Sequence, residues 1–202
     1  MFTGLIRELA EVVNYSNNYL TLRAKYKPKI GDSIATNGAC LTVVKLTHAT
    51  FTVELSNETR NTIAVENLKK RVHIEPAMAI GDRLEGHIVQ GHVDCLGTIK
   101  AITKNQNATD MVISLPKEFV KFTISKGSIA IDGVSLTLNT IDENEFKLTI
   151  IAHTLKQTIF NEYSVGRQVN IETDMFARYI HHMFKKRKNI GWDSVDKIMA
   201  LY

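Results

Sequence analysis

Two stretches of this 202-residue chain place a thiol or a hydroxyl two positions beyond an Asx-Gly pair. One is 37–42 (Asn-Gly-Ala-Cys-Leu-Thr), with Cys40, and the other is 132–137 (Asp-Gly-Val-Ser-Leu-Thr), with Ser135. Residues two apart on a strand face the same side, so each stretch presents a second hydroxyl beside the first group. With nearby backbone amides, such groups suit nucleophilic catalysis or the stabilisation of developing negative charge. The alternative is a hairpin corner followed by ordinary strand residues.

A second unusual stretch, residues 86–94, carries two histidines five positions apart, His87 and His92, each behind a glycine. Metal-binding histidine pairs on a helix prefer a spacing of four, and no third ligand stands nearby, so no metal site is expected. Proton transfer near neutral pH is one function for these side chains. The alternative, a loop histidine bonded to backbone, remains equally open.

The two Asx-Gly stretches belong to an internal repeat, which decides how the chain is organised. Residues 34–43 reappear as residues 129–138 (129 − 34 = 95), and the same offset extends to Thr59. The lead-in strands, residues 4–7 and 92–95, correspond at a different offset (92 − 4 = 88). Each half therefore has the size of a small barrel.

The pattern within each half is that of β-structure. Runs rich in β-branched residues flank short polar connectors at 47–49 and 142–144, which predicts one hairpin in each half. Many short strands interrupted by few prolines favour closed barrels. We therefore predict an all-β fold of two tandem six-stranded Greek-key β-barrels, at residues 1–88 and 89–174, followed by a C-terminal α-helix.

Residues 175–202 depart from the β pattern. Apolar residues from Met175 to Phe184 fall at helical spacing and predict a helix with one apolar face. Two barrels that close their own cores leave this face without a partner. Other copies of the chain are the expected partner, because soluble oligomers are usually symmetric. The alternative is that the helix packs back onto its own barrel.

Composition and missing motifs exclude several classes of protein. No apolar run is long enough to span a bilayer, no signal peptide is recognisable, and the two cysteines, Cys40 and Cys95, form no CxxC pair. A cytoplasmic protein without a membrane segment is expected. The net charge of +4 comes largely from residues 185–188, which suits a solvated helix end better than a nucleic-acid site. GxGxxG, P-loop and GxSxG motifs are all missing from the sequence.

Taken together, these motifs resemble those of the riboflavin synthase family. Residues 1–6, 37–43, 86–94 and 131–137 match the family's motifs in order, and the match extends from Met1 to about Asp174. The resemblance implies a dismutation of two molecules of 6,7-dimethyl-8-ribityllumazine. A four-carbon unit passes from one to the other and gives riboflavin and 5-amino-6-ribitylaminouracil, the last step of riboflavin biosynthesis. No metal or redox cofactor is implied.

The resemblance also implies an assembly: a homotrimer formed through the C-terminal helix, with each active site between the N-terminal barrel of one subunit and the C-terminal barrel of its neighbour. Association with lumazine synthase stays open. A rival reading is a lumazine- or flavin-binding optical protein of the same fold without turnover. The presence of both Asx-Gly turns, both threonines and the helix favours the enzyme.

Carried over position by position, the resemblance implies two sets of substrate contacts. The N-barrel pocket and its neighbouring face would be lined by Gly4, Leu5, Ile6, Cys40, Leu41, Thr42, Glu54, Leu55, Ser56, Asn57, Glu58, Thr59, Gly91, His92 and Val93, and His87 would also contact substrate. The C-barrel pocket would be lined by Lys126, Ser135, Leu136, Thr137, Thr149, Ile150, Ile151, Ala152, His153 and Thr154. Ala39 replaces a cysteine of some relatives, and the pair at 152–153 replaces Pro-Glu.

Catalytic roles follow from what the reaction needs. One lumazine must lose a proton from its C7 methyl group, and the other must accept a nucleophile at C7. Cys40 or Ser135 would supply or position the nucleophile, while Asp132 would orient it or accept a proton. His92 would transfer protons, and Phe2 would close the pocket over a ring. Backbone amides near Thr42 and Thr137 would stabilise charge on the ring carbonyls.

Overall fold

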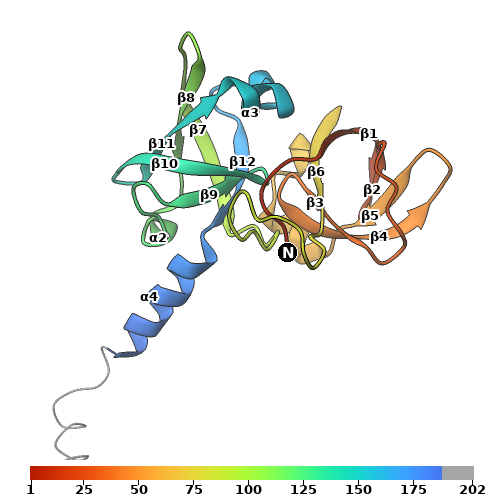
Figure 1. Ribbon diagram of the computed structural model, residues 1–202, viewed down its shortest axis with the longest axis horizontal. Coiled ribbons are helices and arrows are strands. Elements are labelled where there is room, and N and C mark those ends of the chain that lie inside the picture. Colours follow the sequence, from red (N-terminus) through yellow and green to blue (C-terminus); the bar gives the residue numbers. More distant parts are fainter. Residues whose placement is uncertain (188–202) are drawn as a thin grey trace, which may run out of the picture.

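The structure is a computed structural model that describes residues 1–187; the predicted helical segment beyond Arg187 lies outside the described residues. The N-terminal half supplies six strands and two short helices, which lie on the right of Figure 1. They are β1 (Glu8–Ser16), β2 (Tyr19–Arg23), β3 (Ser33–Thr36), β4 (Ala39–Leu46), β5 (Phe51–Glu54), α1 (Asn57–Thr62), η1 (Val65–Asn67) and β6 (Arg71–Pro76).

The C-terminal half repeats this order and adds two helices. Its elements are β7 (Cys95–Lys104), β8 (Ala108–Ser114), α2 (Lys117–Val120), β9 (Ser128–Ile131), β10 (Val134–Asp142), β11 (Glu145–Ile151), α3 (Ala152–Gln157), η2 (Phe160–Glu162), β12 (Gln168–Thr173) and α4 (Met175–Arg187). α1 and α3 stand at the same place in the two halves, after β5 and β11. The predicted hairpins are present as β4–β5 and β10–β11.

Each half closes into a six-stranded barrel, which confirms the predicted fold class. The strand order is β1-β2-β5-β4-β3-β6 in the first barrel and β10-β11-β8-β7-β12-β9 in the second, and every pair is antiparallel. Register shifts recur at matched places, in β4 at Val43/Lys45 and in β10 at Leu138/Thr140. Such bulges bend a strand and help a sheet to close. The predicted lead-in strands are wrong: β1 begins only at Glu8 and β7 only at Cys95.

Alternation of side chains fills each barrel. In β11, Phe146, Leu148 and Ile150 are buried, whereas the residues between them are not, as expected for a strand with one face toward a core. Phe51 and Phe146, which the offset of 95 relates, occupy the two separate cores. A third, small cluster, with Phe2 and Val89, lies where the barrels meet.

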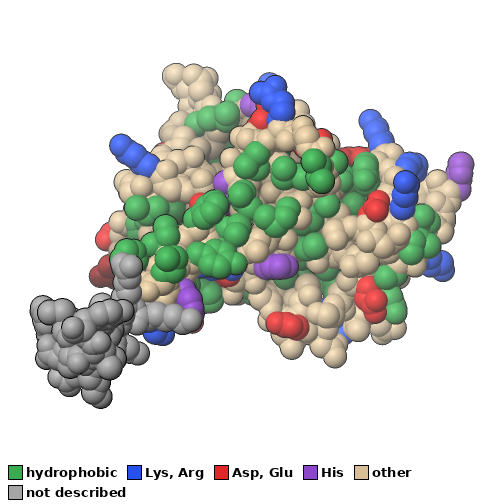
Figure 2. All heavy atoms as spheres, turned by 60° about the horizontal axis from the view of Figure 1, so that its bottom comes forward, with side chains coloured by type: hydrophobic (Ala, Val, Ile, Leu, Met, Phe, Trp, Pro, Cys, Tyr) green, Lys and Arg blue, Asp and Glu red, His purple; other side chains and the backbone are tan. Residues whose placement is uncertain are grey.

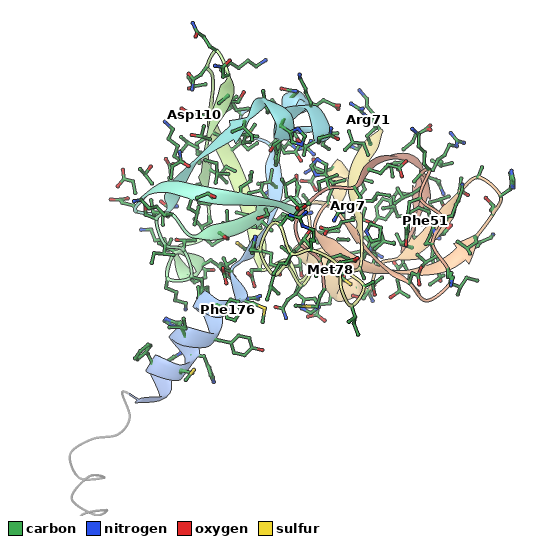
Figure 3. The ribbon with its side chains drawn as sticks, in the orientation of Figure 1. Arg7, Phe51, Arg71, Met78, Asp110 and Phe176 are labelled. Atoms are coloured by element: carbon green, nitrogen blue, oxygen red, sulfur yellow. The ribbon has the colours of Figure 1, made fainter. Side chains whose placement is uncertain are left out.

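Helix α4 leaves the second barrel after β12 and projects away from both barrels (Figure 1). Its side toward the barrels makes contacts, because the rings of His181 and Phe122 meet edge to face with centroids 5.3 Å apart. Five large apolar side chains on the helix remain more than half exposed: Phe176, Tyr179, Ile180, Met183 and Phe184. Figure 3 shows Phe176 at the start of the helix. Among residues 1–187, no helix is long and apolar enough to cross a membrane.

Candidate active site

The two Asx-Gly turns meet each other where the barrels join. Asn37 and Asp132 have φ angles of 42° and 43°, and the following glycines have 83° and 82°, as expected for the tight turns that join twisted strands. A Cβ on Gly38 would lie 2.7 Å from the backbone nitrogen of Gly133. Gly38 and Gly133 are therefore needed where the two turns touch. They let the backbones of the two barrels approach each other.

A buried hydrogen-bond network surrounds these turns with a pseudo-twofold symmetry. The backbone N–H of His73 donates to Asn37 Oδ1, and the backbone N–H of Asn170 donates to Asp132 Oδ1. Across the junction, Asn170 Nδ2 donates to the Asn37 carbonyl, and His73 Nδ1 bonds the Asp132 carbonyl. The backbone N–H of Ile159 donates to His73 Nε2, which leaves Nδ1 as the protonated nitrogen.

Asp132 therefore does not lie in a pocket. Its side chain is fully buried, and its Oδ2 accepts a hydrogen bond of 2.5 Å from the hydroxyl of Tyr163. Burial raises the pKa of Asp132 to about 6, although Tyr163 and the Asn170 amide counteract this. A carboxylate enclosed by the protein in this way cannot take a proton from a ligand, so the structure gives Asp132 a role in joining the barrels instead of the catalytic role expected from the sequence.

The lead-in segments before β1 and β7 cross over at this junction. Gly91, which leads into the second barrel, lies against Cys40 of the first, and its carbonyl accepts a 2.8 Å hydrogen bond from the Cys40 N–H. Gly4, which leads into the first barrel, lies against Ser135 of the second, with an equal bond from the Ser135 N–H. Residues 4–6 were expected to line the N-barrel pocket, but in the structure they lie against the second barrel.

Apolar side chains follow the same crossing. Val93 packs against the core of the first barrel, whereas Ile6 packs against the core of the second. In the structure, Gly4 corresponds to Gly91, an offset of 87 positions (91 − 4 = 87). The offset expected from the sequence was 88 (92 − 4 = 88). Each barrel thereby completes the wall beside the other's Cys40 or Ser135.

A buried carboxylate holds each lead-in in place. Glu172 on β12 accepts backbone hydrogen bonds from Gln90, Gly91 and His92, at 2.6, 2.8 and 3.1 Å. Glu75 on β6 accepts equivalent bonds from the backbone of residues 3–4. Burial raises the pKa of Glu172 to about 6, and the amide hydrogen bonds act in the opposite direction. The carboxylate thus fixes the backbone that forms the wall of the site.

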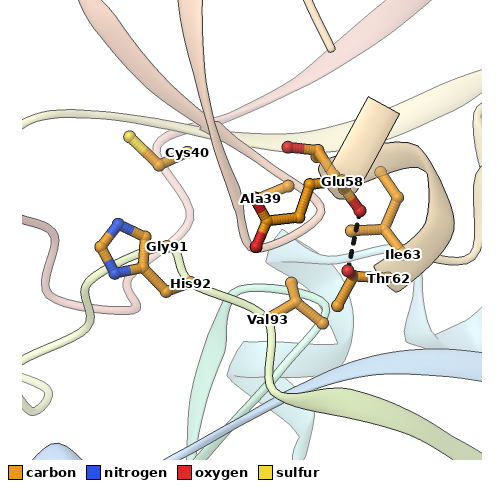
Figure 4. A pocket seen from close by; sticks show the side chains of 9 residues that line it. Ala39, Cys40, Glu58, Thr62, Ile63, Gly91, His92 and Val93 are labelled. Carbon is orange, nitrogen blue, oxygen red and sulfur yellow. Dashed lines mark hydrogen bonds between the residues drawn. The ribbon is translucent and has the colours of Figure 1, made fainter. Parts of the chain in front are cut away.

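A pocket of about 460 Å³ opens beside Cys40 (Figure 4). Cys40 and His92 lie on one side of it, and the side chains of Glu58 and Thr62 lie on the other. Thr62 belongs to α1 and donates a 2.8 Å hydrogen bond to the Glu58 carbonyl. Predicted residues that line this pocket are Cys40, Glu58, Thr59, Gly91, His92 and Val93, and the unpredicted ones are Ala39, Thr62 and Ile63.

In the second half, His87 reaches the residue that corresponds to Cys40. His87 Nδ1 lies 2.7 Å from Ser135 Oγ, and burial lowers the pKa of His87. The Nε2 of His87 is buried and has no hydrogen-bond partner among residues 1–187. His87 was expected to contact substrate, and in the structure it lies beside Ser135, the nucleophile candidate of the second barrel.

Other predicted residues fall into three groups. Thr42, Glu54, Ser56, Asn57, Lys126, Thr137, Thr149, Ile151, Ala152 and His153 are exposed around the barrels, and Leu5, Leu136 and Thr154 are half-buried. Leu41, Leu55 and Ile150 belong to the barrel cores. Phe2 is fully buried between the barrels, with a ring carbon 3.0 Å from where a Cβ on Gly91 would stand. Phe2 thus supports the pocket wall from behind and does not close over a ring.

Glu75, Glu172, His73 and Asn170 were missed from the sequence. A signal for them exists: residues 72–75 read Val-His-Ile-Glu and residues 169–172 read Val-Asn-Ile-Glu, a repeat at an offset of 97 (169 − 72 = 97). Among residues 1–187, no cluster of three or more His, Cys, Asp or Glu side chains could hold a metal ion.

Known proteins share both the sequence and the fold. The lumazine binding domain family matches residues 3–77 and again residues 90–174. Riboflavin synthase of Photobacterium phosphoreum is 46% identical over 98% of this chain and 98% of its own length. Riboflavin synthase of Bacillus subtilis is 37% identical over 92% of this chain and 91% of its own length.

Two solved structures support the fold alone, since their sequence identity is low. The crystal structure of LumP complexed with riboflavin has a TM-score of 0.77 at 21% identity, covering 86% of this chain and 99% of LumP. The crystal structure of LumP complexed with 6,7-dimethyl-8-(1'-D-ribityl) lumazine has a TM-score of 0.75 at 20% identity, with the same coverage.

Proposed function

We propose a function from one premise: the chain belongs to the riboflavin synthase family of lumazine-binding proteins. The protein catalyses the dismutation of two 6,7-dimethyl-8-ribityllumazine molecules to riboflavin and 5-amino-6-ribitylaminouracil, as a transferase of a four-carbon unit. The two products together contain every atom of the two substrates, so the net reaction consumes no oxidant. The division into domains at residues 1–88, 89–174 and 175–202 stays a prediction.

The observation that carries the proposal is the repetition of one arrangement in both halves. A reaction between two identical molecules calls for two similar sites, and the chain provides Cys40 beside Gly91 and Ser135 beside Gly4. The two sites differ in the group that faces the ligand, a thiol in one and a hydroxyl bonded to His87 in the other. That difference suits a reaction in which one lumazine donates and the other accepts.

The side chains divide the work as follows. The neutral imidazole of His87 accepts a proton from Ser135, which makes the hydroxyl a better nucleophile toward C7 of the accepting lumazine. His92 lies at the mouth of the pocket beside Cys40 and transfers protons there. Glu172 and Glu75 hold the walls rigid, which keeps the two ligands oriented; orientation of two bound reactants accounts for about 7–11 kcal/mol of barrier in favourable cases.

The exposed face of α4 supports a homotrimer. Phe176, Ile180 and Phe184 line an apolar groove of about 540 Å³ between the helix and residues 121–128. A contiguous exposed apolar surface marks an interaction site, and the occupant proposed here is the same surface of a second and a third copy of the chain. Figure 2 shows hydrophobic side chains gathered over the middle of one face, with most Lys and Arg side chains toward the edges.

A trimer places the N-barrel site of one subunit opposite the C-barrel site of its neighbour, so that two bound lumazines face each other. Both cysteines are free, which accords with a cytoplasmic protein. An association with lumazine synthase, the enzyme that makes the substrate, remains a proposal to be tested by co-sedimentation of the two purified proteins.

The decisive experiment supplies the purified protein with 6,7-dimethyl-8-ribityllumazine alone. The expected result is riboflavin and 5-amino-6-ribitylaminouracil in equal amounts, followed by flavin absorbance and by chromatography. Binding of the lumazine without either product would overturn the proposal and would identify a lumazine-binding optical protein instead. No binding and no product would remove both functions.

A further inference from the structure

Arg178, in the first turns of α4, holds the segment that leads into the second barrel. Its Nη1 donates a 2.7 Å hydrogen bond to Asp94 Oδ1, and its Nη2 donates a 2.8 Å bond to Gln90 Oε1. The ion pair is largely shielded, because the Arg178 side chain is 25% exposed and that of Asp94 is 11% exposed. Shielded charge-assisted bonds of this kind are stronger than surface ion pairs.

Asp94 connects three elements at once. Its other oxygen, Oδ2, accepts hydrogen bonds from the N–H and the hydroxyl of Thr173, at 2.7 and 2.6 Å, where β12 ends and α4 is about to begin. Glu172, the preceding residue, already holds the amides of residues 90–92. The end of β12, the start of α4 and residues 90–94 therefore form one bonded unit.

The opposite side of residues 90–94 is the wall of the ligand pocket. Gly91, His92 and Val93 line the pocket beside Cys40, whereas Gln90 lines a separate cavity of about 260 Å³ with Arg178, Tyr179 and His182. A displacement of the helix would pull on Gln90 and Asp94, and would thus move the wall between them.

This connection has no counterpart in the first half. The position of Asp94 is occupied there by Arg7 (94 − 87 = 7), which is exposed, and no helix follows β6. Glu75 holds the first lead-in without such support. The first barrel therefore forms without a contact like that of Arg178 with Asp94 and Gln90. This contact is an addition to the repeated scaffold.

We propose that Arg178 is a positioning residue that couples the C-terminal helix to the pocket beside Cys40, through Asp94 and Gln90. The occupant of that pocket, a ribityllumazine, rests on the proposed function. Assembly through α4 then sets the geometry of the N-barrel ligand site, while the C-barrel site around Ser135 is unaffected.

The test compares Arg178→Ala, Arg178→Lys and Asp94→Asn with the wild type. Hydrogen exchange followed by mass spectrometry should show faster exchange in peptides covering residues 90–94 of Arg178→Ala and Asp94→Asn. Fluorescence titration with 6,7-dimethyl-8-ribityllumazine should show one class of site weakened about tenfold and the other unchanged, since the broken bonds are charge-assisted. Arg178→Lys keeps the charge but not the two-pronged contact, and should be intermediate.

A matched control is Arg23→Ala, which breaks a 2.8 Å ion pair with Glu11 between β1 and β2 and should change neither readout. Sedimentation velocity shows whether a variant still assembles. If Arg178→Ala dissociates, the coupling is judged from hydrogen exchange at residues 90–94 in Asp94→Asn, because that variant leaves the helix sequence intact. Unchanged exchange at residues 90–94 in both variants would overturn the coupling. A wild type that binds no lumazine would overturn the proposed function alone, because the exchange measurement needs no ligand.

Discussion

The imidazole of His87 and the hydroxyl of Ser135 are hydrogen-bonded at 2.7 Å. His87 lies in the segment that connects the two barrels, and Ser135 lies on β10 of the second barrel. The other ring nitrogen of His87 is buried and bonds to nothing in the described part of the chain, and burial lowers the pKa of the ring. The lowered pKa favours the neutral ring, and in the tautomer protonated at Nε2 the Nδ1 atom accepts the hydroxyl proton of Ser135. A neutral imidazole bonded to a hydroxyl is an arrangement that activates nucleophiles.

Replacing Ser135 by alanine should abolish this arrangement while leaving the barrel intact. We expect turnover of Ser135→Ala to fall about 100-fold or more, as for loss of a positioned acid–base or nucleophilic group. The free energy of unfolding should fall by only about 1 kcal/mol, the worth of one hydrogen bond. Steady-state assay and urea denaturation measure the two effects. Ser114→Ala, a half-buried serine on β8, is the control and should retain full activity.

The two cysteines should react very differently with a thiol reagent. Cys40 is half-buried and lines the pocket, whereas Cys95 is buried and its pKa is raised to about 12, chiefly by burial. Thiolates are the reactive form, so native protein should be labelled at Cys40 and not at Cys95. Mass spectrometry of the labelled peptides checks this. Ribityllumazine should slow the labelling of Cys40, and denatured protein should be labelled at both positions.

Gly91 should tolerate no side chain. Its φ is +78°, and an added Cβ would lie 2.6 Å from Cys40 Cβ and 2.9 Å from Cys40 N. Gly81 has a similar φ of +99°, but a Cβ there would meet nothing within 4 Å. Gly81→Ala should therefore lower the free energy of unfolding only through the strained backbone conformation, by about 1–2 kcal/mol. Gly91→Ala should lose about 1–3 kcal/mol more because of overpacking. Thermal unfolding compares the two variants, and equal losses would show that the close approach of Gly91 to Cys40 is unimportant.

The junction network should respond to acid in a way that one substitution reveals. Burial lowers the pKa of His73 to about 4, from 6.5, so the unfolded chain takes up this proton first and His73 costs stability as the pH falls from 6.5 to about 4. Burial raises the pKa of Asp132 from 3.8 to about 6. The folded state takes up that proton first, so Asp132 adds stability as the pH falls from about 6 to 3.8, and opposes His73.

Asp132→Asn removes one side of this balance. Its stability should fall more steeply than that of the wild type between pH 6.5 and 4, by at most about 1.4 kcal/mol per pH unit, the limit for one proton. Urea denaturation at a series of pH values gives the slope. Asp142→Asn, which removes an exposed carboxylate on β10, should leave the slope unchanged. Parallel curves for wild type and Asp132→Asn would contradict the assignment.

The apolar face of α4 should hold the assembly together. Ile180→Asp and Phe184→Asp place a charge in the groove beside Ile124 and Phe122, where burial against another subunit would cost several kcal/mol. Sedimentation velocity should show loss of the trimer, with each barrel still folded by circular dichroism. Lys185→Asp, on the opposite side of the helix by its spacing, should remain trimeric. A wild type that sediments as a monomer would exclude the assembly altogether.

The sequence predicts the barrels well because the information is local. Two local patterns can be recognised without a distant partner: the β-branched runs of β4 and β10, and the Asx-Gly turn before each of them. Their recurrence at an offset of 95 strengthens the prediction. The pocket residues Cys40 and His92 were found for the same reason, since each stands in a recognisable motif.

The parts that could not be predicted depend on contacts between halves. That Gly91 lies on Cys40 and Gly4 on Ser135 follows from the crossing of the lead-ins, which no local pattern records. His73 and Asn170 stand at equivalent places in the repeat at residues 72–75 and 169–172, but that repeat does not show that their side chains bond across the junction. Asp132 was expected to orient the nucleophile or accept a proton, because nothing in the sequence shows that Tyr163 would enclose it.

The meeting of Gly38 with Gly133 also has an evolutionary consequence. Two equivalent turns in contact across a pseudo-twofold axis are the interface that two identical single-barrel chains would form. Fusion of two such chains would have preserved that contact while freeing each copy to mutate separately. In those terms, Cys40 and Ser135 are two descendants of one ancestral position, each free to change once the two copies were encoded separately.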